Sequence, residues 1–225
     1  MQIVVLKRKL KKGIALLCRF IRKPAFTYDD FFQFEFEKKK GIVTRGYIKE
    51  SELGIPLELT PKAYMPGGSI YLSRVLKKLK INENDSGIDL GCGLGSVMFY
   101  MAKFPFKRIS GIEFSYELSE GCKNNLEKLN DSRLNLFYGD AGEFDSFDDY
   151  NYIFMFNPFG LEIIRKVINN ISKSYKSIPR IITLIYKNPV YDKEILKYNF
   201  FHKIFEYKTE SPGIIFIVYS NNSSL

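Results

Sequence analysis

Short apolar segments alternate with helical segments over the last two thirds of this chain, and this alternation constrains the fold more than any other feature. The apolar segments are rich in β-branched and aromatic side chains, which is typical of buried strands. Strands separated by helices predict a parallel sheet that helices cover on both faces. The expected strands span residues 87–90, 108–112, 134–138, 152–156 and 181–186, and the expected helices span residues 69–79, 96–103, 116–129, 161–174 and 193–198.

The end of the chain departs from this alternation. Residues 201–207 and 214–219 are two strand-like segments joined by the turn Ser211-Pro212-Gly213, which predicts an antiparallel hairpin. We therefore expect an α/β fold with a doubly wound, mostly parallel seven-stranded sheet and an antiparallel C-terminal hairpin.

A glycine-rich turn follows the first expected strand. Its glycines, Gly91, Gly93 and Gly95, let the backbone turn tightly and approach a ligand, and the helix that follows presents free amides. A dinucleotide fingerprint would have its third glycine at position 96, which is Ser96. This spacing, with Asp89 just before the turn, favours a nucleoside cofactor without a pyrophosphate over NAD.

Acidic residues also follow the next two strands, and together these motifs resemble the class I S-adenosylmethionine-dependent methyltransferases over about residues 64–219. The resemblance implies a Rossmann-like methyltransferase fold with S-adenosylmethionine as cofactor. The alternative is that the glycines only shape a turn and the acids are solvated. By resemblance, Asp89, Gly91, Gly93 and Gly95 hold the methionine part of the cofactor, Glu113 accepts hydrogen bonds from both ribose hydroxyls, and Asp140 with Ala141 contacts the adenine amine.

The fourth expected strand ends in Asn157-Pro158-Phe159. This segment is similar to the Asn/Asp-Pro-Pro-aromatic motif of amino methyltransferases, although it has only one proline. The resemblance makes Asn157, Pro158 and Phe159 the catalytic candidates, with transfer of a methyl group to a nitrogen or oxygen acceptor by in-line displacement. The alternative is a tight turn in which Phe159 packs against the core.

A second resemblance covers residues 46–189 and includes Tyr64-Met65-Pro66. It is to a group of bacterial methyltransferases that are distantly similar to the histone-lysine methyltransferases without a SET domain, and it implies that the region of Tyr64 closes over the cofactor. Lys187 and Asn188 are weaker candidates for the substrate mouth, and His202 for a base; ordinary structural roles are the alternatives.

The net charge of +9 is concentrated at the N-terminus. Residues 1–23 hold eight basic residues and no acid, which leaves 26 basic and 25 acidic residues in the rest of the chain. This distribution argues against a nucleic-acid groove across the whole domain. The apolar residues of the segment share one helical stripe and Pro24 ends it, so residues 1–24 are predicted to form a basic amphipathic helix. The helix packs against the domain or lies on an anionic membrane surface; nucleic acid is the least favoured partner.

Composition and spacing complete the expected organisation. Residues 1–24 are the basic helix, residues 25–66 an aromatic-rich arm or lid, and residues 67–225 the S-adenosylmethionine-binding domain. Three widely separated cysteines predict neither a disulfide framework nor a metal site. The chain is expected to be cytoplasmic, with peripheral contact at the inner membrane surface through residues 1–23. A cofactor-binding attachment protein without catalysis is the alternative to an enzyme.

Overall fold

The computed structural model describes residues 35–44, 48–49, 63–157, 159–210 and 213–223. The chain divides into two compact units, Met1–Lys40 and Gly41–Leu225. Residues 35–40, in the first unit, are helical. All labelled strands and helices belong to the second unit.

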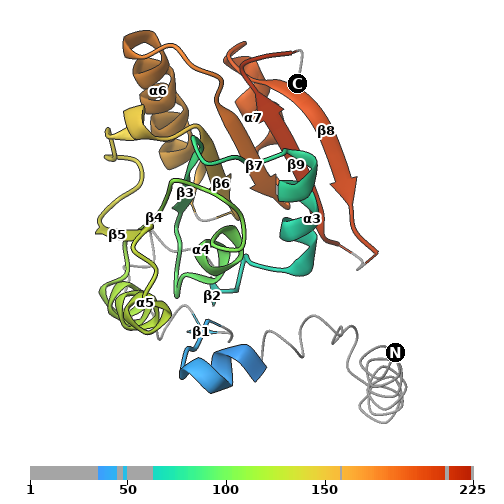
Figure 1. Ribbon diagram of the computed structural model, residues 1–225. Coiled ribbons are helices and arrows are strands. Elements are labelled where there is room, and N and C mark those ends of the chain that lie inside the picture. The colour runs from blue at the N-terminus through green and yellow to red at the C-terminus, as the bar shows by residue number, and fades with distance from the viewer. Residues whose placement is uncertain (1–34, 45–47, 50–62, 158, 211–212, 224–225) are drawn as a thin grey trace, which may run out of the picture. The chain divides into compact units, whose positions relative to one another are not determined.

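The second unit is built around a seven-stranded sheet (Figure 1). Its order is β5-β4-β3-β6-β7-β9-β8, so the chain starts near the middle, moves to one edge and then crosses to the other. The first five of these strands are parallel, whereas β9 is antiparallel to both β7 and β8. The strands are β3 (Ser86–Leu90), β4 (Arg108–Glu113), β5 (Leu134–Tyr138), β6 (Tyr152–Met155), β7 (Thr183–Lys187), β8 (His202–Lys208) and β9 (Ile215–Ser220).

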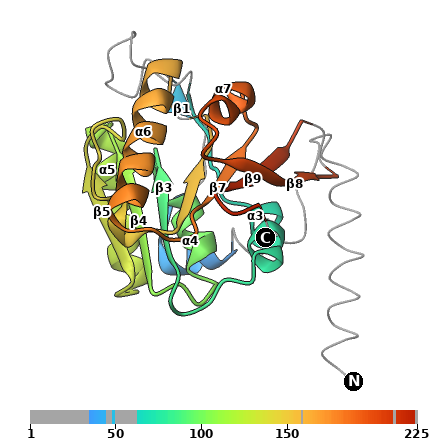
Figure 2. The same ribbon diagram turned by 90° about the horizontal axis from the view of Figure 1, so that it is seen from above.

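Helices cover both faces of the sheet, and Figure 2 shows this arrangement from above. Alternate strand residues supply two cores: Ile88 and Leu90 pack in the core under α6 and α7, while Phe154 and Ile185 pack in the core under α3, α4 and α5. The helices are α3 (Ile70–Lys78), α4 (Ser96–Met101), α5 (Tyr116–Leu129), α6 (Leu161–Ser177) and α7 (Asp192–Lys197), with a 3-10 turn η3 (Phe147–Asp149).

Local capping explains where the helices begin and end. The Ser69 hydroxyl accepts a hydrogen bond from the amide of Leu72 at the start of α3, and the Ser115 hydroxyl does the same for Leu118 at the start of α5. Helix α5 ends at Asn130, whose φ of 52° is left-handed. Ser115 and Asn130 therefore fix the loops after β4 and before β5.

The doubly wound, mostly parallel sheet and the antiparallel C-terminal hairpin are confirmed, with boundaries within about three residues of those expected. A separate two-stranded sheet pairs β1 (Ile48–Lys49) with β2 (Ala63–Tyr64). The predicted helix over residues 1–24 lies outside the described residues. Among the helices of the described segments, none is both long enough and apolar enough to cross a membrane.

Candidate functional site

The candidate site lies at the carboxyl ends of the parallel strands, where the loops after β3, β4 and β5 are joined by backbone hydrogen bonds. The amides of Gly91 and Cys92 donate to the carbonyl oxygen of Ile112, at 2.9 and 3.0 Å. The amide of Gly139 donates to the carbonyl oxygen of Glu113, at 3.0 Å. Three segments far apart in sequence therefore form one surface, at the edge where ligands bind in open α/β sheets.

The glycine turn needs its glycines for conformational reasons. Gly91, Gly93 and Gly95 have φ values of 76°, 55° and 83°, in the left-handed region that other residues rarely adopt. A side chain at Gly95 would also put its Cβ 3.0 Å from the Cys122 sulfur. The predicted tight turn is therefore present, and it brings backbone amides toward the end of β4.

Glu113 is the best-positioned acid of the site. Its side chain is buried, its Oε2 accepts from the amide of Gly93 at 2.8 Å, and its Oε1 accepts from the amide of Ser115 at 2.9 Å. Burial raises the pKa of the carboxyl group, and these amide hydrogen bonds oppose the rise. These hydrogen bonds orient the carboxylate, and its oxygens keep lone pairs that can accept hydrogen bonds from a ligand.

Asp89 lies in β3 on the face covered by α4. It is 2% exposed, and within the described part of the chain its carboxylate receives no hydrogen bond. Burial, and secondarily the charge of Glu113, raises its pKa well above the ordinary value. A buried carboxylate without a donor fits a ligand that brings a positive charge or several N–H groups.

Asp140 and Ala141 follow β5 directly. Asp140 Oδ1 accepts from the amide of Gly142 at 2.7 Å, which closes a short turn, and the Ala141 side chain is buried. Glu113 and Gly139 share a backbone hydrogen bond, so this turn adjoins the glutamate.

The segment after β6 packs against the loop after β7. Asn157 has a left-handed φ of 42°; its Nδ2 donates to the carbonyl oxygen of Asn188 at 2.5 Å and its Oδ1 accepts from the amide of Val190 at 3.3 Å. Phe159 is half-buried against the α6 core, and Pro158 lies outside the described residues. The amide of Asn157 thus holds two loops together, and its oxygen keeps one lone pair for a further donor.

The segment before α3 crosses above the start of α4. The Ser96 hydroxyl accepts from the amide of Gly68 at 3.0 Å, and a Cβ on Gly68 would lie 2.4 Å from the Ser96 carbonyl oxygen. A dinucleotide site would have glycine at position 96. Here the Ser96 side chain instead holds the segment before α3 in place through its hydrogen bond with Gly68. Tyr64 lies in β2, paired with Ile48, and its side chain is outside the described part.

The weaker candidates have different placements. Lys187 is buried, whereas His202 is an exposed residue at the start of β8. Asn188 Oδ1 accepts from the amide of Ile215 at 2.8 Å, so this side chain closes the loop against β9.

Exposed aromatic rings beside the acids were missed by sequence reasoning. Phe114, directly after Glu113, is 41% exposed, and Tyr138, at the end of β5, is 64% exposed. The sequence could have indicated these two rings, because each lies at a strand end close to a candidate acid, where a buried core side chain is not expected.

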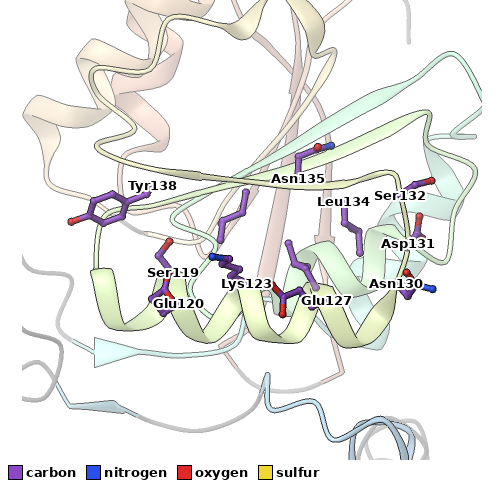
Figure 3. A pocket seen from close by; sticks show the side chains of 12 residues that line it. Ser119, Glu120, Lys123, Glu127, Asn130, Asp131, Ser132, Leu134, Asn135 and Tyr138 are labelled. Atoms are coloured by element: carbon purple, nitrogen blue, oxygen red, sulfur yellow. The ribbon is translucent and has the colours of Figure 1, made fainter.

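A separate hollow of about 650 Å³ lies between α5 and the edge strand β5 (Figure 3). Leu126, Leu134 and Leu136 contribute apolar lining, and Glu120, Lys123 and Glu127 contribute charges from α5. The predicted site residues do not line it, so it is a feature of the sheet edge.

Comparisons with known proteins agree with this geometry. A family model described as a methyltransferase domain matches residues 81–209. A probable cobalt-precorrin-6B C(15)-methyltransferase (decarboxylating) of Methanococcus maripaludis is 28% identical over 115 residues, which are 50% of this chain and 60% of that protein. A 23S rRNA (uracil(1939)-C(5))-methyltransferase of Francisella tularensis subsp. novicida is 33% identical over 108 residues, which are 45% of this chain and 23% of that protein. The chain therefore spans less than two thirds of each of these relatives.

Solved structures share the fold at low sequence identity. An RNA methyltransferase from Salinibacter ruber, in complex with S-adenosyl-L-homocysteine, has a TM-score of 0.53 and 15% identity, covering 72% of this chain and 96% of its own. A precorrin-6y C5,15-methyltransferase from Geobacter metallireducens has a TM-score of 0.53 and 18% identity, covering 79% and 98%. With a family model over more than half of its length and this fold, the chain belongs to the methyltransferase domain family.

Proposed function

We propose that the protein is an S-adenosylmethionine-dependent methyltransferase, and the orientation of Glu113 is the observation that carries this proposal. Two backbone amides, from Gly93 and Ser115, fix one carboxylate oxygen each. The lone pairs that remain match two neighbouring hydroxyl groups, as a ribose presents them. Glu113 therefore binds the ribose.

The other acid and the exposed rings fit the rest of the cofactor. Asp89 is buried and receives no hydrogen bond from the described part of the chain, which suits the α-ammonium group of a methionine moiety. The exposed ring of Phe114, next to Glu113, offers a flat apolar surface to adenine. The turn at Asp140 and Ala141 contacts the adenine amine, and the Tyr64 region covers the site.

The residues of this chain position the reaction more than they take part in it. When bound, the cofactor supplies a methyl group on a positively charged sulfur, which a nucleophile displaces in line. Asn157 accepts a hydrogen bond from the attacking group through its free lone pair, and Phe159 packs beside it. Closed loops over the site exclude water.

Isothermal titration with S-adenosylhomocysteine tests the cofactor assignment. Glu113→Gln should weaken binding about 10-fold or more because an amide cannot accept both ribose hydroxyls as the carboxylate does. Glu120→Gln, an exposed residue of α5, is the matched control and should bind like the wild type. Equal affinities of all three proteins would reject the ribose role of Glu113.

Methyl transfer needs a separate test because the acceptor is unidentified. The wild-type protein and Asn157→Ala are incubated with cofactor carrying a radiolabelled methyl group and with host extract, which is then separated into lipid, protein, nucleic-acid and small-molecule fractions. Label should enter one fraction with the wild type and fall at least about 10-fold with the variant. Cofactor binding without label in any fraction would favour the non-catalytic alternative.

A nitrogen or oxygen acceptor is part of the proposal, supported by the likeness of Asn157-Pro158-Phe159 to the amino methyltransferase motif. The names of the two curated relatives instead specify carbon positions, C(15) of a cobalt-precorrin and C(5) of a uracil. Fragmentation of the labelled product in a mass spectrometer separates these cases, because it locates the added methyl group on a nitrogen, an oxygen or a carbon atom.

The charge of residues 1–23 supports a proposal about location. This segment brings a cytoplasmic enzyme to the anionic inner membrane surface, where each basic residue contributes about 1 kcal/mol. Flotation with vesicles of phosphatidylglycerol and phosphatidylcholine should recover the full chain but not a variant that begins at residue 24. Equal recovery of both proteins in the soluble fraction would exclude membrane contact, and neutral vesicles are the control.

A further inference from the structure

Lys187 is a buried cation at the carboxyl end of β7 for which the proposed function has no use. It is 6% exposed, and among the described residues no carboxylate pairs with it. Its Nζ donates two long hydrogen bonds, to the carbonyl oxygens of Pro66 at 3.4 Å and Gly67 at 3.3 Å, and lies 4.0 Å from the centre of the Phe156 ring. Buried cations are usually paired, so this one is positioned to receive an anion.

The side chain of Lys187 lies on the same face of the sheet as Asp89. Alternation along the strands puts Asp89, Phe154 and Ile185 on the face covered by α3 and α4, and Lys187 follows Ile185 by two residues. The register pairs Asp89 with Phe154 and Phe154 with Ile185. A buried acid and a buried base, neither of which has an ionic partner within the described segments, therefore share one surface at the carboxyl edge of the sheet.

The lysine side chain also reaches back toward Asp89. Its Nζ lies over Phe156 of the intervening strand segment and bonds to Gly67. Gly67 lies directly above Phe154, since a Cβ built on it would be 3.3 Å from that ring. Phe154 is the register partner of Asp89. The Phe156 position, over which the amine lies, is therefore one strand spacing across, roughly 5 Å, and two residues along, roughly 7 Å, from Asp89. A small zwitterion can bridge such a gap.

We propose that Lys187 binds the α-carboxylate of the methionine part of the cofactor while Asp89 binds its α-ammonium group. This inference rests on the proposed function and adds a specificity determinant to it: the pair selects a free amino acid head with both charges. Burial lowers the pKa of Lys187 to about 8, as expected of a cation that has no anion beside it. In the free protein, the carbonyl oxygens of Pro66 and Gly67 orient the amine.

The test compares two ligands that differ only in the carboxylate. S-adenosylhomocysteine carries both charges of the head, whereas its decarboxylated form, S-adenosyl-3-thiopropylamine, keeps the ammonium alone. In the wild type, loss of the carboxylate should weaken binding by roughly 10- to 100-fold, the effect of one charge-assisted hydrogen bond. In Lys187→Met, which keeps the length and packing of the side chain, the two ligands should bind equally.

Controls separate a binding role from a structural one. Lys103→Met removes an exposed lysine that also lies 4.0 Å from a ring centre, that of Tyr100, and should leave the preference for S-adenosylhomocysteine unchanged. Lys187→Gln keeps donors for the carbonyl oxygens of Pro66 and Gly67 and should lose the preference as Lys187→Met does. It serves as the second variant if the methionine variant does not fold.

Three outcomes overturn the inference. The first is an undiminished preference for the carboxylate in either Lys187 variant. The second is an equal loss of affinity for both ligands, which indicates a structural or packing role. The third is a wild-type protein that binds neither S-adenosylhomocysteine nor its decarboxylated form. Only this third result would also contradict the proposed function.

Discussion

At the scale of single residues, the site contains charges that cost stability in the free protein. Asp89 and Lys187 are both buried without an ionic partner among the described residues. Burial disfavours their charged forms, so the pKa of the acid is raised and the pKa of the base is lowered. Each residue should therefore show the opposed effects on stability and binding that are common at functional sites.

Asp89→Asn should stabilise the free protein and weaken cofactor binding. The raised pKa means that the folded state bears a cost for this buried acid at pH values above its ordinary pKa, and the cost falls as pH drops from the raised pKa toward the ordinary one. The amide has nearly the same shape without the charge, so the free energy of unfolding should rise by about 1–3 kcal/mol. Urea denaturation without ligand and titration with S-adenosylhomocysteine measure the two effects. A less stable variant with unchanged affinity would contradict the assignment.

Lys187 makes stability depend on pH in a defined window. Its pKa is about 8 in the folded protein and 10.5 ordinarily, so the unfolded chain binds more protons between these values and stability rises with pH. At pH 7 Lys187→Met should be more stable than the wild type by about 3 kcal/mol, and the difference should vanish near pH 11. Urea denaturation at several pH values checks this. A pH-independent difference would show that Lys187 titrates normally, and Lys103→Met supplies the baseline.

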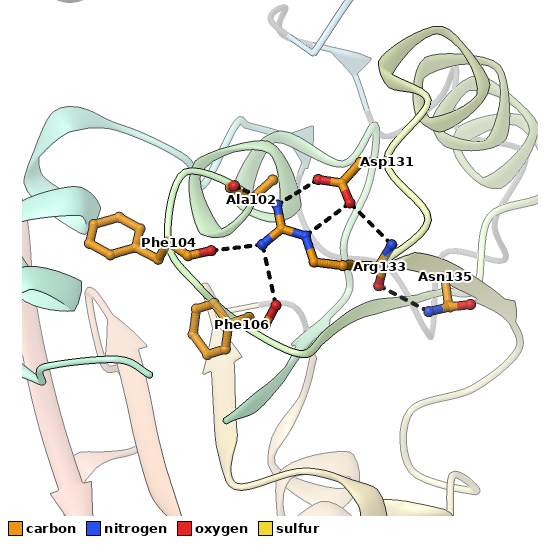
Figure 4. A network of polar contacts seen from close by, with 6 residues as sticks. All are labelled: Ala102, Phe104, Phe106, Asp131, Arg133 and Asn135. Atoms are coloured by element: carbon orange, nitrogen blue, oxygen red, sulfur yellow. Dashed lines mark hydrogen bonds and ion pairs between the residues drawn. The ribbon is translucent and has the colours of Figure 1, made fainter. Parts of the chain in front are cut away.

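At the scale of elements, one side chain joins the loop after α4 to the start of β5 (Figure 4). The Arg133 guanidinium donates to the carbonyl oxygens of Ala102 at 2.8 Å, Phe104 at 2.9 Å and Phe106 at 3.2 Å, and pairs with Asp131 at 2.6 Å. The planar group satisfies carbonyl oxygens that no helix or strand bonds. It therefore sets the position from which β4 begins.

Arg133→Met should destabilise the fold without changing the cofactor site. Carbonyl oxygens left without their donor reduce the free energy of unfolding by about 2–4 kcal/mol. Arg108→Met breaks only the exposed pair with Asp149 and should cost less than about 1 kcal/mol. Urea denaturation gives both values. Weaker binding of S-adenosylhomocysteine by folded Arg133→Met would show that the hydrogen bonds of Arg133 also shape the cofactor site.

At the scale of the whole molecule, the compact unit starts before the expected domain boundary at residue 67. The unit begins at Gly41, and residues 41–44 contact the glycine turn through Asn125. The Asn125 side chain exchanges two hydrogen bonds with the backbone of Val43, at 3.0 and 2.8 Å, and donates a third to the carbonyl oxygen of Leu94. Residues 41–44 therefore support the turn that carries Gly93 and Gly95.

A comparison of two shortened chains tests this boundary. Residues 41–225 should bind S-adenosylhomocysteine within about twofold of the full chain, because the unit is compact. Residues 67–225 lack the buried Ile42 and leave Asn125 without its two hydrogen bonds to Val43, so they should lose at least about 3 kcal/mol of stability. Denaturation and titration measure both. Equal stability of the two chains would place the boundary at residue 67.

The sequence alone determined the order of elements, and it predicted the position of the candidate site. Alternating apolar segments fix strands and helices through local periodicity, and Gly91, Gly93 and Gly95 mark the turn because their backbone angles exclude other residues. Asp89 and Glu113 follow from their places at strand ends. The strands, the helices and the glycine turn depend on residues that are close together in the chain, so they can be predicted from the sequence.

Only the tertiary structure decided which side chains meet. The contact of Lys187 with Pro66 and Gly67 joins residues about 120 positions apart, and that of Asn125 with Val43 joins residues 82 positions apart. No periodicity encodes such pairs, because they arise when the sheet and its helices bring distant loops to one edge. Burial, which lowers the pKa of Lys187 and raises the pKa of Asp89, is likewise a property of the packed molecule.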